Sequence, residues 1–384
     1  MKILIIRTTP DKVDFVKSTY NHQQLGLAKA LNRKGHQCDV VYFGGSTEEQ
    51  INIEYEKGKT LTVYRVKGKA FLKNGIFRDF SDIISKYDIL QVGGYDQIQS
   101  WKLAKKYSDK MVVYNGTYYS DFNKRYNQKC KLIDKIFVPA YIKNNTFFVT
   151  KNVLSAEFLK AKGIVNVFPI GVGLDVDQFS VMNEYESELS ARLDELKKDN
   201  KLLLYIGRIE PRRNIEFLLK VYVNVRKSNS KTKLVIIGKG NADYVQKCRN
   251  LAKELDLEND IIWIERLEQK YLAKIYRQCN VFLLPTLYEI FGMVLLEAMY
   301  FKLPVVTSLN GGSDILIKDK GTGYIIEKFD ESIWSSKVIE ILNDADESKN
   351  VGERANKLIT EDFTWDALAD RFIEVYKRCL ENHN

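Results

Sequence analysis

LPTLYEIFGMVLLEAMYFKLP, residues 284–304, begins inside NVFLLP, an apolar run with the length of a buried strand. Before its final lysine the only charged residues of this stretch are Glu289 and Glu297. On one continuous helix, two residues eight positions apart would lie ~80° apart around the axis with a rise of ~12 Å, so they would be poor partners. We therefore predict that Glu289 lies in a loop after the strand, and that a helix begins near Phe291 or Gly292 and carries Glu297 on its second turn.

The start of this predicted helix has the chemistry of an anion site. The first amides of a helix have no partners within the helix and carry part of its dipole, so they attract negative charge. Gly292 lets a ligand approach the backbone closely because it has no Cβ. Glu297 would lie ~9 Å further along the axis, about the separation between a diphosphate and the ribose of its nucleotide. A carboxylate there can accept hydrogen bonds from two ribose hydroxyls.

Apolar runs alternate with helical periodicity along nearly the whole chain. This alternation is typical of parallel sheets covered by helices on both faces, so the fold class is predicted as α/β. A chain of 384 residues is too long for one core and suits two domains of ~150 to 200 residues each. The alternation breaks at IGVGLDVDQFS, residues 170–180, and restarts at Lys201.

Domain boundaries follow from this break. We predict two doubly wound, Rossmann-like domains. The predicted parts are a first domain at 1–170, a hinge and linker helix at 171–200, and a second domain at 201–363.

The individual strands are predicted from short apolar runs. In the first half they are KILIIR, QCDVVYF, TLTVYRV, DILQV, MVVYN, KIFVPA, TFFVT and VNVFP. In the second half they are KLLLYIG, KLVIIG, DIIWI and NVFLLP. Helices are expected between most of them, including one from Phe15 to Lys34. Thr364 is placed as the N-cap of the last helix, TWDALADRFIEVYKRCL.

Cysteine usage and hydropathy indicate the compartment. The five cysteines lie at long spacings without a C-x-x-C pair, which argues against a disulfide framework. The opening MKILIIRTTP has only four apolar residues in a row before Arg7, and no apolar run approaches the ~20 residues of a membrane span. We therefore expect a cytoplasmic chain.

The charge is concentrated in the first half. Residues 1–180 hold 28 Lys and Arg against 17 Asp and Glu, a net charge of +11, whereas residues 181–384 hold 31 against 33. Such asymmetry suits an anionic membrane surface, a phosphorylated acceptor or a nucleic acid, although most individual lysines are expected only to solvate helix faces.

A basic turn, LYIGRIEPRRN, follows the first strand of the second half. The strand ends at Gly207, at the carboxyl edge where α/β proteins bind ligands. Two arginines of this turn can hold a departing phosphate without a metal. The alternative is a solvated turn, in which the arginines pair with Glu210 and Glu216.

Several of these motifs, taken in order, resemble the second domain of retaining glycosyltransferases of the GT-B fold, the group called glycosyltransferase family 4. The resemblance covers Leu203 to Ile326, about a third of the chain. It rests on the segments YIGRIEPRRN, LVIIGKGN, LEQKYLAKIYRQCNVFLLPTLYEIFGMVLLEAM and PVVTSLNGGSDILIKDKGTGYII. The resemblance implies that the two domains face each other across a cleft, and that the C-terminal helix at 364–380 crosses back and completes the first domain. It also implies a nucleotide-sugar donor bound by the second domain and an acceptor that faces the first.

The resemblance also implies roles for single residues. Glu289 is expected near the donor sugar hydroxyls, Glu297 on the ribose and Arg208 on the phosphate. The second phosphate-binding cation of the family is usually lysine, and Arg213 holds that place, which keeps the charge and changes the geometry. We take Glu289, Arg208 and Arg213 as the candidate catalytic residues. The remaining candidate donor-binding residues are Gly207, Ile290, Phe291 and Gly292, with Glu297.

The first half resembles the family more loosely. LAKALNRKGHQCDVVYF is similar to the family's first helix and second strand. Where many members have a Gly-Gly loop before that helix, this chain has Ser18 and Thr19, and where many have a histidine after the fourth strand, it has Asn115. Together with His22, these residues are the candidates for the acceptor side.

Asp175 and Asp177 have the D-x-D spacing with which glycosyltransferases of another fold hold Mn²⁺ or Mg²⁺. In a chain with 50 acidic residues such a triplet is expected by chance. Because two arginines already offer positive charge to a diphosphate, we expect no metal site and no cofactor. The base of the nucleotide is expected near Glu265 to Leu267.

Our leading hypothesis is a retaining hexosyltransferase that uses a nucleoside diphosphate sugar, with a UDP-sugar favoured, and a glycan or lipid-linked acceptor in bacterial surface polysaccharide synthesis. We expect peripheral contact between residues 1–170 and the anionic inner face of the cell membrane, and no nucleic-acid partner. One alternative is an inactive subunit that binds the donor. Another is a sugar-nucleotide epimerase on the same fold.

Overall fold

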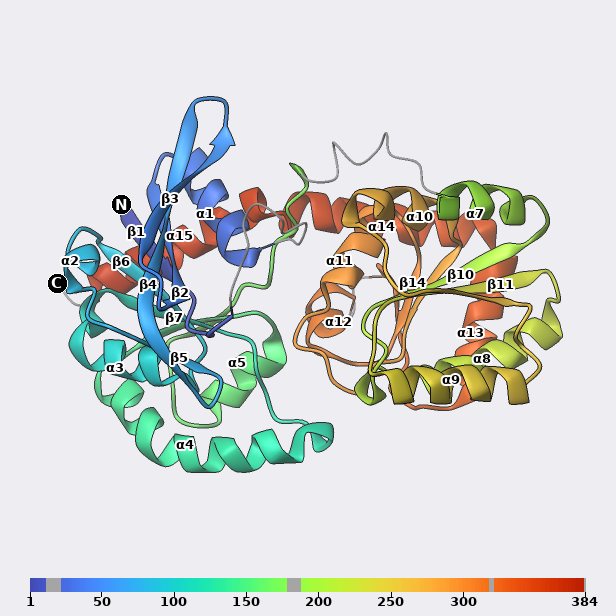
Figure 1. Ribbon diagram of the computed structural model, residues 1–384, viewed down its shortest axis with the longest axis horizontal. Helices are drawn as coiled ribbons and strands as arrows, with labels where there is room; N and C mark the ends of the chain where they lie inside the picture. Colours follow the sequence, from blue (N-terminus) through green and yellow to red (C-terminus); the bar gives the residue numbers. More distant parts are fainter. Residues whose placement is uncertain (12–21, 178–187, 318–320, 383–384) are drawn as a thin grey trace. The chain divides into compact units, whose positions relative to one another are not determined.

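The structure is a computed structural model that describes residues 1–11, 22–177, 188–317 and 321–382 (Figure 1). The chain forms two compact units, Met1–Gly173 with Thr364–Asn384, and Leu174–Phe363. Each unit has its own sheet with helices around it, which confirms the predicted α/β class (Figure 1).

The first unit is built on one sheet with strand order β3-β4-β2-β1-β6-β7-β8-β9, and β5 pairs with β4. Its strands are β1 Lys2–Ile6, β2 Gln37–Gly45, β3 Glu49–Glu56, β4 Lys59–Phe71, β5 Asn74–Phe77, β6 Ile89–Gly93, β7 Met111–Asn115, β8 Phe147–Thr150 and β9 Val167–Pro169. In the middle of the sheet Ile3 pairs with Cys38 on one side and with Ile89 on the other, all in parallel. These three residues are fully buried, as continuous apolar runs predict for a sheet covered on both faces.

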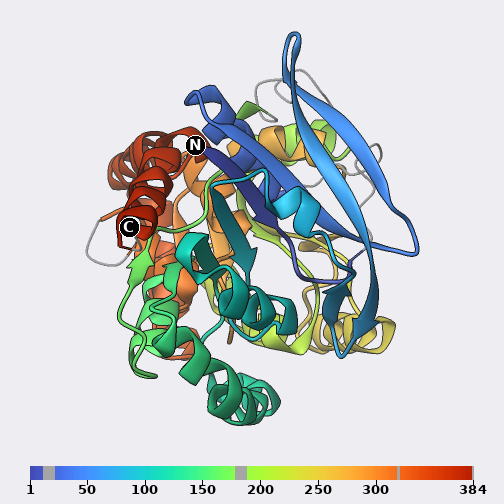
Figure 2. The same ribbon diagram turned by 90° about the vertical axis from the view of Figure 1, so that its left-hand side faces the viewer.

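One edge of this sheet departs from the parallel pattern. β3 and β5 both run antiparallel to β4, and β3 and β4 form the long hairpin visible in Figures 1 and 2. Neither β3 nor β5 was predicted from the sequence. No residue of β3 is buried, so the strand has no apolar run from which it could be recognised.

The helices of the first unit are α1 Gln23–Arg33, α2 Ser81–Ile84, α3 Ile98–Lys106, α4 Lys124–Lys143, α5 Val153–Lys160 and α15 Trp365–Glu381, with 3-10 turns η1 Ser108–Lys110 and η2 Asp121–Asn123. The prediction of a strand at KIFVPA is wrong, because these residues lie within α4. The buried side chains of α4 are Cys130, Phe137, Val138 and Tyr141, which recur at helical spacing. Pro139 removes the helical donor for the carbonyl of Lys135, but that residue is exposed to water.

The C-terminal helix α15 packs in the first unit although it follows the second along the chain. It begins as predicted, with the Thr364 side chain accepting a hydrogen bond from the amide of Ala367. Trp365 occupies the space beside Gly26 and Gly173, where an added Cβ would collide with its ring or backbone. Two glycines in distant parts of the chain therefore make room for one tryptophan.

The second unit has a parallel sheet of order β12-β11-β10-β13-β14-β15. Its strands are β10 Lys201–Ile206, β11 Thr232–Ile237, β12 Ile261–Ile264, β13 Val281–Leu284, β14 Val305–Thr307 and β15 Tyr324–Ile325. Its helices are α7 Glu188–Asp199, α8 Ile215–Ser228, α9 Ala242–Glu254, α10 Leu272–Gln278, α11 Met293–Tyr300, α12 Gly311–Leu316, α13 Glu331–Asn343 and α14 Ala345–Asp362, with 3-10 turns η3 Pro211–Arg213 and η4 Gln269–Tyr271.

The order of these strands positions the candidate site. The chain leaves β10 toward β11 and β12 on one side, and then returns to place β13 on the other side of β10. The loops after β10 and β13 therefore diverge at the carboxyl edge of the sheet, which is where open α/β sheets bind ligands. These loops carry the basic turn and Glu289.

No helix among the described residues is both long and apolar enough to cross a membrane.

Candidate active site

The basic turn after β10 is held by close backbone contacts with the loop after β11. The amide of Ile209 donates to the carbonyl of Lys239 at 2.8 Å, and Ile209 forms an isolated parallel bridge with Gly240. A Cβ on Gly238 would collide with the carbonyl of Gly207. The two glycines of the GKG sequence after β11 therefore leave room for the backbone of the basic turn. Asn214, in the left-handed conformation with φ 56°, then leads the chain into α8.

Arg213 and Glu289 form an ion pair that joins the two loops. Their side chains are only 11% and 13% exposed. Arg212 adds a second cation, with its Nη1 3.6 Å from Oε2 of Glu289. Charges withdrawn this far from water interact strongly, so the pair holds the Glu289 carboxylate in one place.

Arg212 also connects the loops through its backbone and its side chain. Its carbonyl accepts from the amide of Leu287 at 2.8 Å, and its Nη1 donates to the carbonyl of Tyr288 at 2.9 Å. Its Nε lies 2.6 Å from Oε1 of Glu210. In the solvated-turn alternative the arginines would pair with Glu210 and Glu216. The pairing with Glu210 is present, whereas Glu216 pairs with Lys247 at 2.8 Å. Arg212 was not predicted to organise the site.

Arg208 differs from its neighbours in exposure. Its side chain is 74% exposed, and its Nε lies 3.6 Å from Oε2 of Glu210. Its backbone is held, because its carbonyl accepts from the hydroxyl of Tyr205 at 2.8 Å. An exposed guanidinium on a fixed backbone has room to turn toward an anionic ligand.

The helix after the loop begins at Met293, and Gly292 is its N-cap with φ 80°. The prediction of a helix start near Phe291 or Gly292 is therefore accurate to within two residues. Gly292 needs the left-handed conformation that glycine adopts without strain. The loop is supported from behind, because the amide of Gly311 donates to the carbonyl of Glu289 at 3.1 Å and a Cβ on Gly312 would collide with the carbonyl of Phe291.

The loop before the helix is fixed by an apolar anchor. Phe291 is 2% exposed, and its side chain is part of the core. Its amide lies 3.5 Å from Oε1 of Glu289. Ile290 and Gly292 flank it at the start of α11. A helix N-terminus attracts phosphate, and Arg212 and Arg213 offset the negative charge of the Glu289 carboxylate beside it.

Glu297 lies on the second turn of α11, as predicted, and is 6% exposed. Its Oε2 accepts a hydrogen bond of 2.8 Å from the hydroxyl of Tyr276, which is fully buried on α10. Burial raises the pKa of Glu297 to about 7, and the hydrogen bond from Tyr276 partly opposes this rise. Tyr276 was not singled out in the sequence, although it lies on the apolar face of its helix, where a hydroxyl needs a partner.

A cavity of about 350 Å³ lies at the carboxyl ends of β11 and β12. Gly238 and Gly240 line it, and Arg249 lies over the Trp263 ring at 5.2 Å from its centroid. The cavity reaches Glu265, the first residue of the segment where the nucleotide base is expected. Glu265 lies 3.2 Å from Lys239 of the GKG turn.

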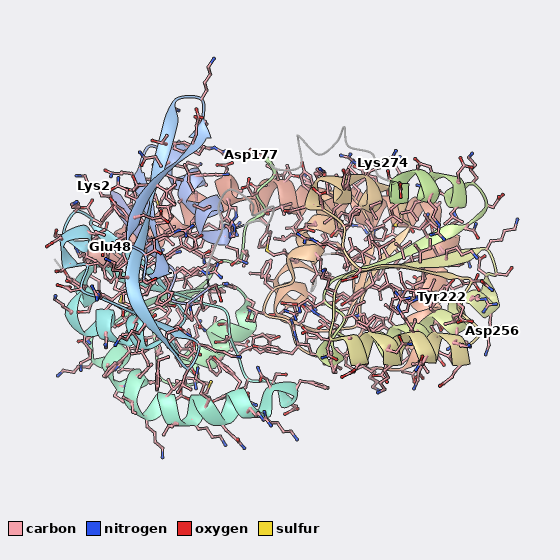
Figure 3. The ribbon with its side chains drawn as sticks, in the orientation of Figure 1. Lys2, Glu48, Asp177, Tyr222, Asp256 and Lys274 are labelled. Atoms are coloured by element: carbon pink, nitrogen blue, oxygen red, sulfur yellow. The ribbon has the colours of Figure 1, made fainter. Side chains whose placement is uncertain are left out.

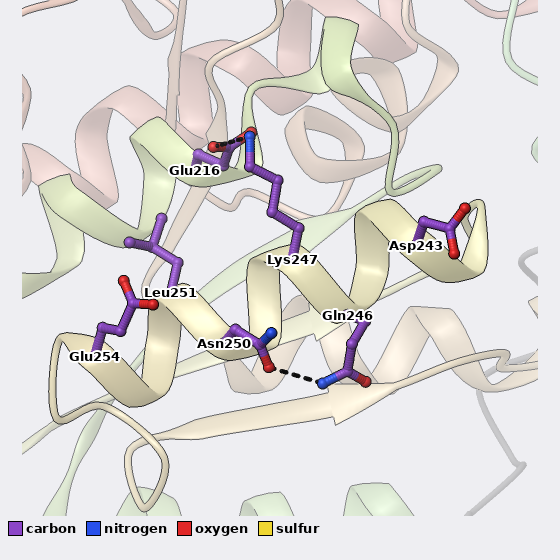
Figure 4. Close-up of a pocket in the computed structure, with 7 residues that line it drawn as sticks. All are labelled: Glu216, Asp243, Gln246, Lys247, Asn250, Leu251 and Glu254. Carbon is purple, nitrogen blue, oxygen red and sulfur yellow. Dashed lines mark hydrogen bonds and ion pairs between the residues drawn. The ribbon is translucent and has the colours of Figure 1, made fainter.

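A larger hollow, about 450 Å³, lies along α9 beside Glu216 of α8 (Figure 4). Figure 4 shows the side chains that line it, with Lys247 paired with Glu216 and Gln246 donating to Asn250 at 2.8 Å. Its lining contains no arginine, in contrast to the group of arginines near Glu289.

The candidate acceptor residues of the first unit have mixed outcomes. Ser18 and Thr19 lie outside the described residues. His22 is the N-cap residue of α1, and its pKa is lowered by burial and by the positive charge of Arg7. Asn115 is 1% exposed and bonds to the Tyr95 amide at 3.3 Å and the Ser155 hydroxyl at 2.8 Å. Asn115 therefore has a structural role at the end of β7.

Asp175 and Asp177 differ in environment. Asp175 is 7% exposed, whereas Asp177 is exposed on the surface (Figure 3). Within the described ranges, no three His, Cys, Asp or Glu side chains are grouped so that they could hold a metal ion.

Residues 188–377 match the family model described as glycosyl transferases group 1. An uncharacterized glycosyltransferase of Methanocaldococcus jannaschii is 27% identical over 381 residues, which cover 93% of each chain. D-inositol 3-phosphate glycosyltransferase of Corynebacterium glutamicum is 25% identical over 56% of this chain and 52% of its own length. Lipopolysaccharide 1,2-N-acetylglucosaminetransferase of Salmonella typhimurium is 27% identical over 60% of this chain and 63% of its own. The chain thus spans only about half to two thirds of these two relatives.

Solved structures of similar fold cover the chain almost completely. Sucrose-phosphate synthase from Thermosynechococcus elongatus has a TM-score of 0.75 at 17% identity, with 100% of both chains covered. HepE from Anabaena, solved in complex with UDP, has a TM-score of 0.74 at 14% identity, with 98% of this chain and 100% of HepE covered. At such low identity these matches show the fold alone, and it is the GT-B fold of the predicted family.

Proposed function

Because the chain belongs to the glycosyl transferases group 1 through residues 188–377, we propose that it moves a hexose-type sugar from a nucleoside diphosphate sugar to a glycan or lipid-linked acceptor. The observation that carries this proposal is the Arg213–Glu289 ion pair, which lies between the loops of two adjacent strands and beside the start of α11. It places a cation, a carboxylate and a helix N-terminus together at the edge of one sheet.

A UDP-sugar is the first donor to consider. Solved structures of HepE hold UDP, UDP-glucose, or UDP with glucose. The Salmonella relative acts on lipopolysaccharide according to its name, which supports synthesis of a bacterial surface polysaccharide as the setting. We further propose a cytoplasmic enzyme with peripheral contact between residues 1–170 and the inner face of the membrane.

The diphosphate is the leaving group of the proposed reaction. The bond between the anomeric carbon and the phosphate oxygen breaks, and negative charge develops on the diphosphate. Arg208 turns toward this charge from its exposed position, and Arg213 meets it from its fixed one. The amides at the start of α11 add their dipoles. Because the negative charge on the diphosphate grows as the bond breaks, these donors stabilise the transition state more than the ground state.

The acceptor completes the exchange on the same face of the sugar. Its hydroxyl oxygen forms the new bond to the anomeric carbon, and its proton passes to the departing phosphate oxygen. The anomeric configuration is retained, and no nucleophile from the protein is required. Glu289, positioned by its two arginines, accepts hydrogen bonds from hydroxyls of the donor sugar, while Glu297 is assigned to the ribose.

We propose that no divalent metal takes part in this reaction. Arginine stays charged at any workable pH and can present paired donors to a phosphate, so the charge that a metal would supply is available from the chain itself. Excess EDTA is expected to leave turnover near the untreated rate. Loss of activity in EDTA and recovery with Mn²⁺ or Mg²⁺ would refute this part of the proposal and direct attention to Asp175 and Asp177.

The proposal is tested with a panel of UDP-, GDP- and ADP-sugars, by thermal shift and by release of free sugar. One donor at a hundredfold excess over its Kd should stabilise the fold by ~2.7 kcal/mol and be hydrolysed slowly. A donor that binds without any turnover, even with acceptors supplied, would indicate an inactive donor-binding subunit. Interconversion of the donor without an acceptor would indicate an epimerase.

A further inference from the structure

Helix α4 carries an apolar surface that the core of the first unit does not use. Among the described residues, eleven large side chains with apolar or aromatic character are exposed, and five of these lie between residues 119 and 142. On α4 itself they are Leu132 at 66% exposure, Ile136 at 54% and Ile142 at 48%. A cluster of this kind is unusual, since exposed apolar residues are normally scattered.

The orientation of α4 is fixed by its opposite face. Phe137 stacks on Trp101 of α3 with ring centroids 5.2 Å apart. Tyr141 packs edge-on against Phe148 of β8 at 5.2 Å, and its hydroxyl donates to the Tyr95 carbonyl at 2.8 Å. These contacts hold the buried side of the helix, so Leu132 and Ile136 point away from the unit. In both views α4 lies at the outer edge of its unit (Figures 1 and 2).

Leu132 and Ile136 are one helical turn apart, and Pro139 continues the row at the next turn. Basic residues border this row, while the helix contains six Lys and Arg against one acid, Asp134. Asp134 is ion-paired with Lys162 and does not belong to the exposed row. Lys129 is also exposed, but it is ion-paired with Asp96. The other exposed basic residues of the helix, none of which forms an ion pair with another described residue, are Lys124, Arg125, Lys131, Lys135 and Lys143.

The α4 face, defined as Leu132, Ile136 and Pro139 with these five basic residues, is an aliphatic row with a positive border, and Ile142 lies on its flank. Helices that lie flat in the interface of a bilayer have this combination, with apolar side chains among the acyl chains and lysines beside anionic headgroups. A helix of 20 residues, about 30 Å long, offers enough length for several such contacts.

We propose that the α4 face docks this protein on an anionic bilayer. The proposal names the surface for the peripheral membrane contact proposed above, and it does not depend on the transfer reaction. A second copy of the chain is a poorer occupant, because a symmetric pair would bring two sets of like charges together. Nucleic acid would satisfy the lysines but would leave the aliphatic row without a partner.

Insertion of the aliphatic row into a bilayer can be measured with a single fluorescent label. All five native cysteines are buried, so a cysteine introduced in Leu132→Cys should react selectively with a polarity-sensitive fluorophore. Ile333→Cys on α13, where the native residue is 47% exposed, provides the matched control in the second unit. With the full chain and vesicles containing anionic phosphatidylglycerol, emission from position 132 should shift to the blue and emission from position 333 should not. Equal responses at both positions, or none at either, would overturn the proposal.

The charge requirement has its own paired variants. Each lysine near an anionic surface contributes about fivefold to the partition constant, so Lys131→Gln/Lys135→Gln should lower vesicle binding by about 30-fold. Lys349→Gln/Lys357→Gln on α14 removes the same charge from exposed positions and should change binding less than about twofold. Equal losses in both variants would mean that net charge, and not the α4 face, governs binding.

Two further readouts separate this proposal from its alternatives. Donor hydrolysis without vesicles should be the same in wild type and in Lys131→Gln/Lys135→Gln, so a failure of docking leaves the proposed reaction untouched. Light scattering without vesicles should give the mass of one chain. A doubled mass that Leu132→Gln reduces by half would assign the face to a second copy and overturn membrane docking.

Discussion

Arg213 and Glu289 lie 76 positions apart in the sequence and form an ion pair that is nearly buried, joining the loops after β10 and β13. Arg208, five residues earlier in the same turn, is 74% exposed. The two arginines that the sequence assigns to one phosphate site therefore differ in role. Arg213 is ion-paired with Glu289, whereas Arg208 presents its positive charge to water.

Arg213→Ala should destabilise the second unit. The substitution removes the ion-pair partner of the Glu289 carboxylate, which is 13% exposed, while Arg212 stays 3.6 Å from it. Withdrawing a partner from a mostly buried charge should lower the free energy of unfolding by about 1 to 3 kcal/mol. Urea denaturation of the two proteins measures the difference. Arg213→Ala/Glu289→Ala should recover part of the loss, and a double variant that is as unstable as the sum of both singles would contradict the pairing.

Arg208→Ala should leave stability unchanged and reduce turnover. Its side chain is mostly in water, so its removal should change the free energy of unfolding by less than about 0.5 kcal/mol. Turnover should fall ~10²-fold or more, because one electrostatic contact to the departing diphosphate is lost. Steady-state kinetics and a melting curve on the same preparation check both statements. Full turnover in Arg208→Ala would remove this residue from the site.

Glu297 should make stability depend on pH. Its pKa is raised to about 7 by burial, so the folded protein binds a proton more tightly than the unfolded chain does. The stability that this bound proton contributes is fully present below the ordinary pKa of a glutamate, and it is lost as the pH rises through about 7. Compared with Glu297→Gln, the wild type should be equally stable at pH 4.5 and less stable at pH 8, by up to about 3 kcal/mol. Parallel stability curves for the two proteins between these pH values would exclude the raised pKa.

Substitutions of Glu289 and Glu297 should have different effects on nucleotide binding and on turnover. Glu297→Ala should weaken binding of the free nucleoside diphosphate, because the ribose contact is lost. Glu289→Gln should change the affinity for the free nucleotide by less than about threefold. It should lower turnover, because the contact that is lost is to the donor sugar. Calorimetric titration with the nucleotide and steady-state rates separate the two effects. Equal losses of nucleotide affinity would contradict the separate assignments.

The elements of the candidate site could be predicted from the sequence because each has a local sequence pattern. A buried strand, a glycine and a helix start can be recognised within a few residues, so α11 begins within two residues of its predicted start. The partners of the site residues could not be predicted. Arg212 meets Tyr288, and Tyr276 meets Glu297, across contacts that depend on how the loops and helices pack.

The prediction of elements failed where local preference and tertiary packing disagree. KIFVPA is rich in residues that favour strands, yet it belongs to α4 because Phe137 and Tyr141 face the same core at helical spacing. β3 has alternating Ile51 and Ile53, but it lies at an exposed sheet edge and has no buried run. Asn115 was selected because it holds the place of a family histidine, and its buried hydrogen bonds to Tyr95 and Ser155 depend on packing that the sequence does not reveal.

The most direct test of a retaining transferase is the configuration of the sugar that it releases. The wild type is incubated with the donor that stabilises it best, in excess EDTA, and the anomer of the freed sugar is read by proton NMR before it equilibrates in solution. We predict slow release of the same anomer that the donor carries, and at least a ~10²-fold slower release by Arg208→Ala. Release of the opposite anomer, or release at the same rate by both proteins, would contradict the proposed function.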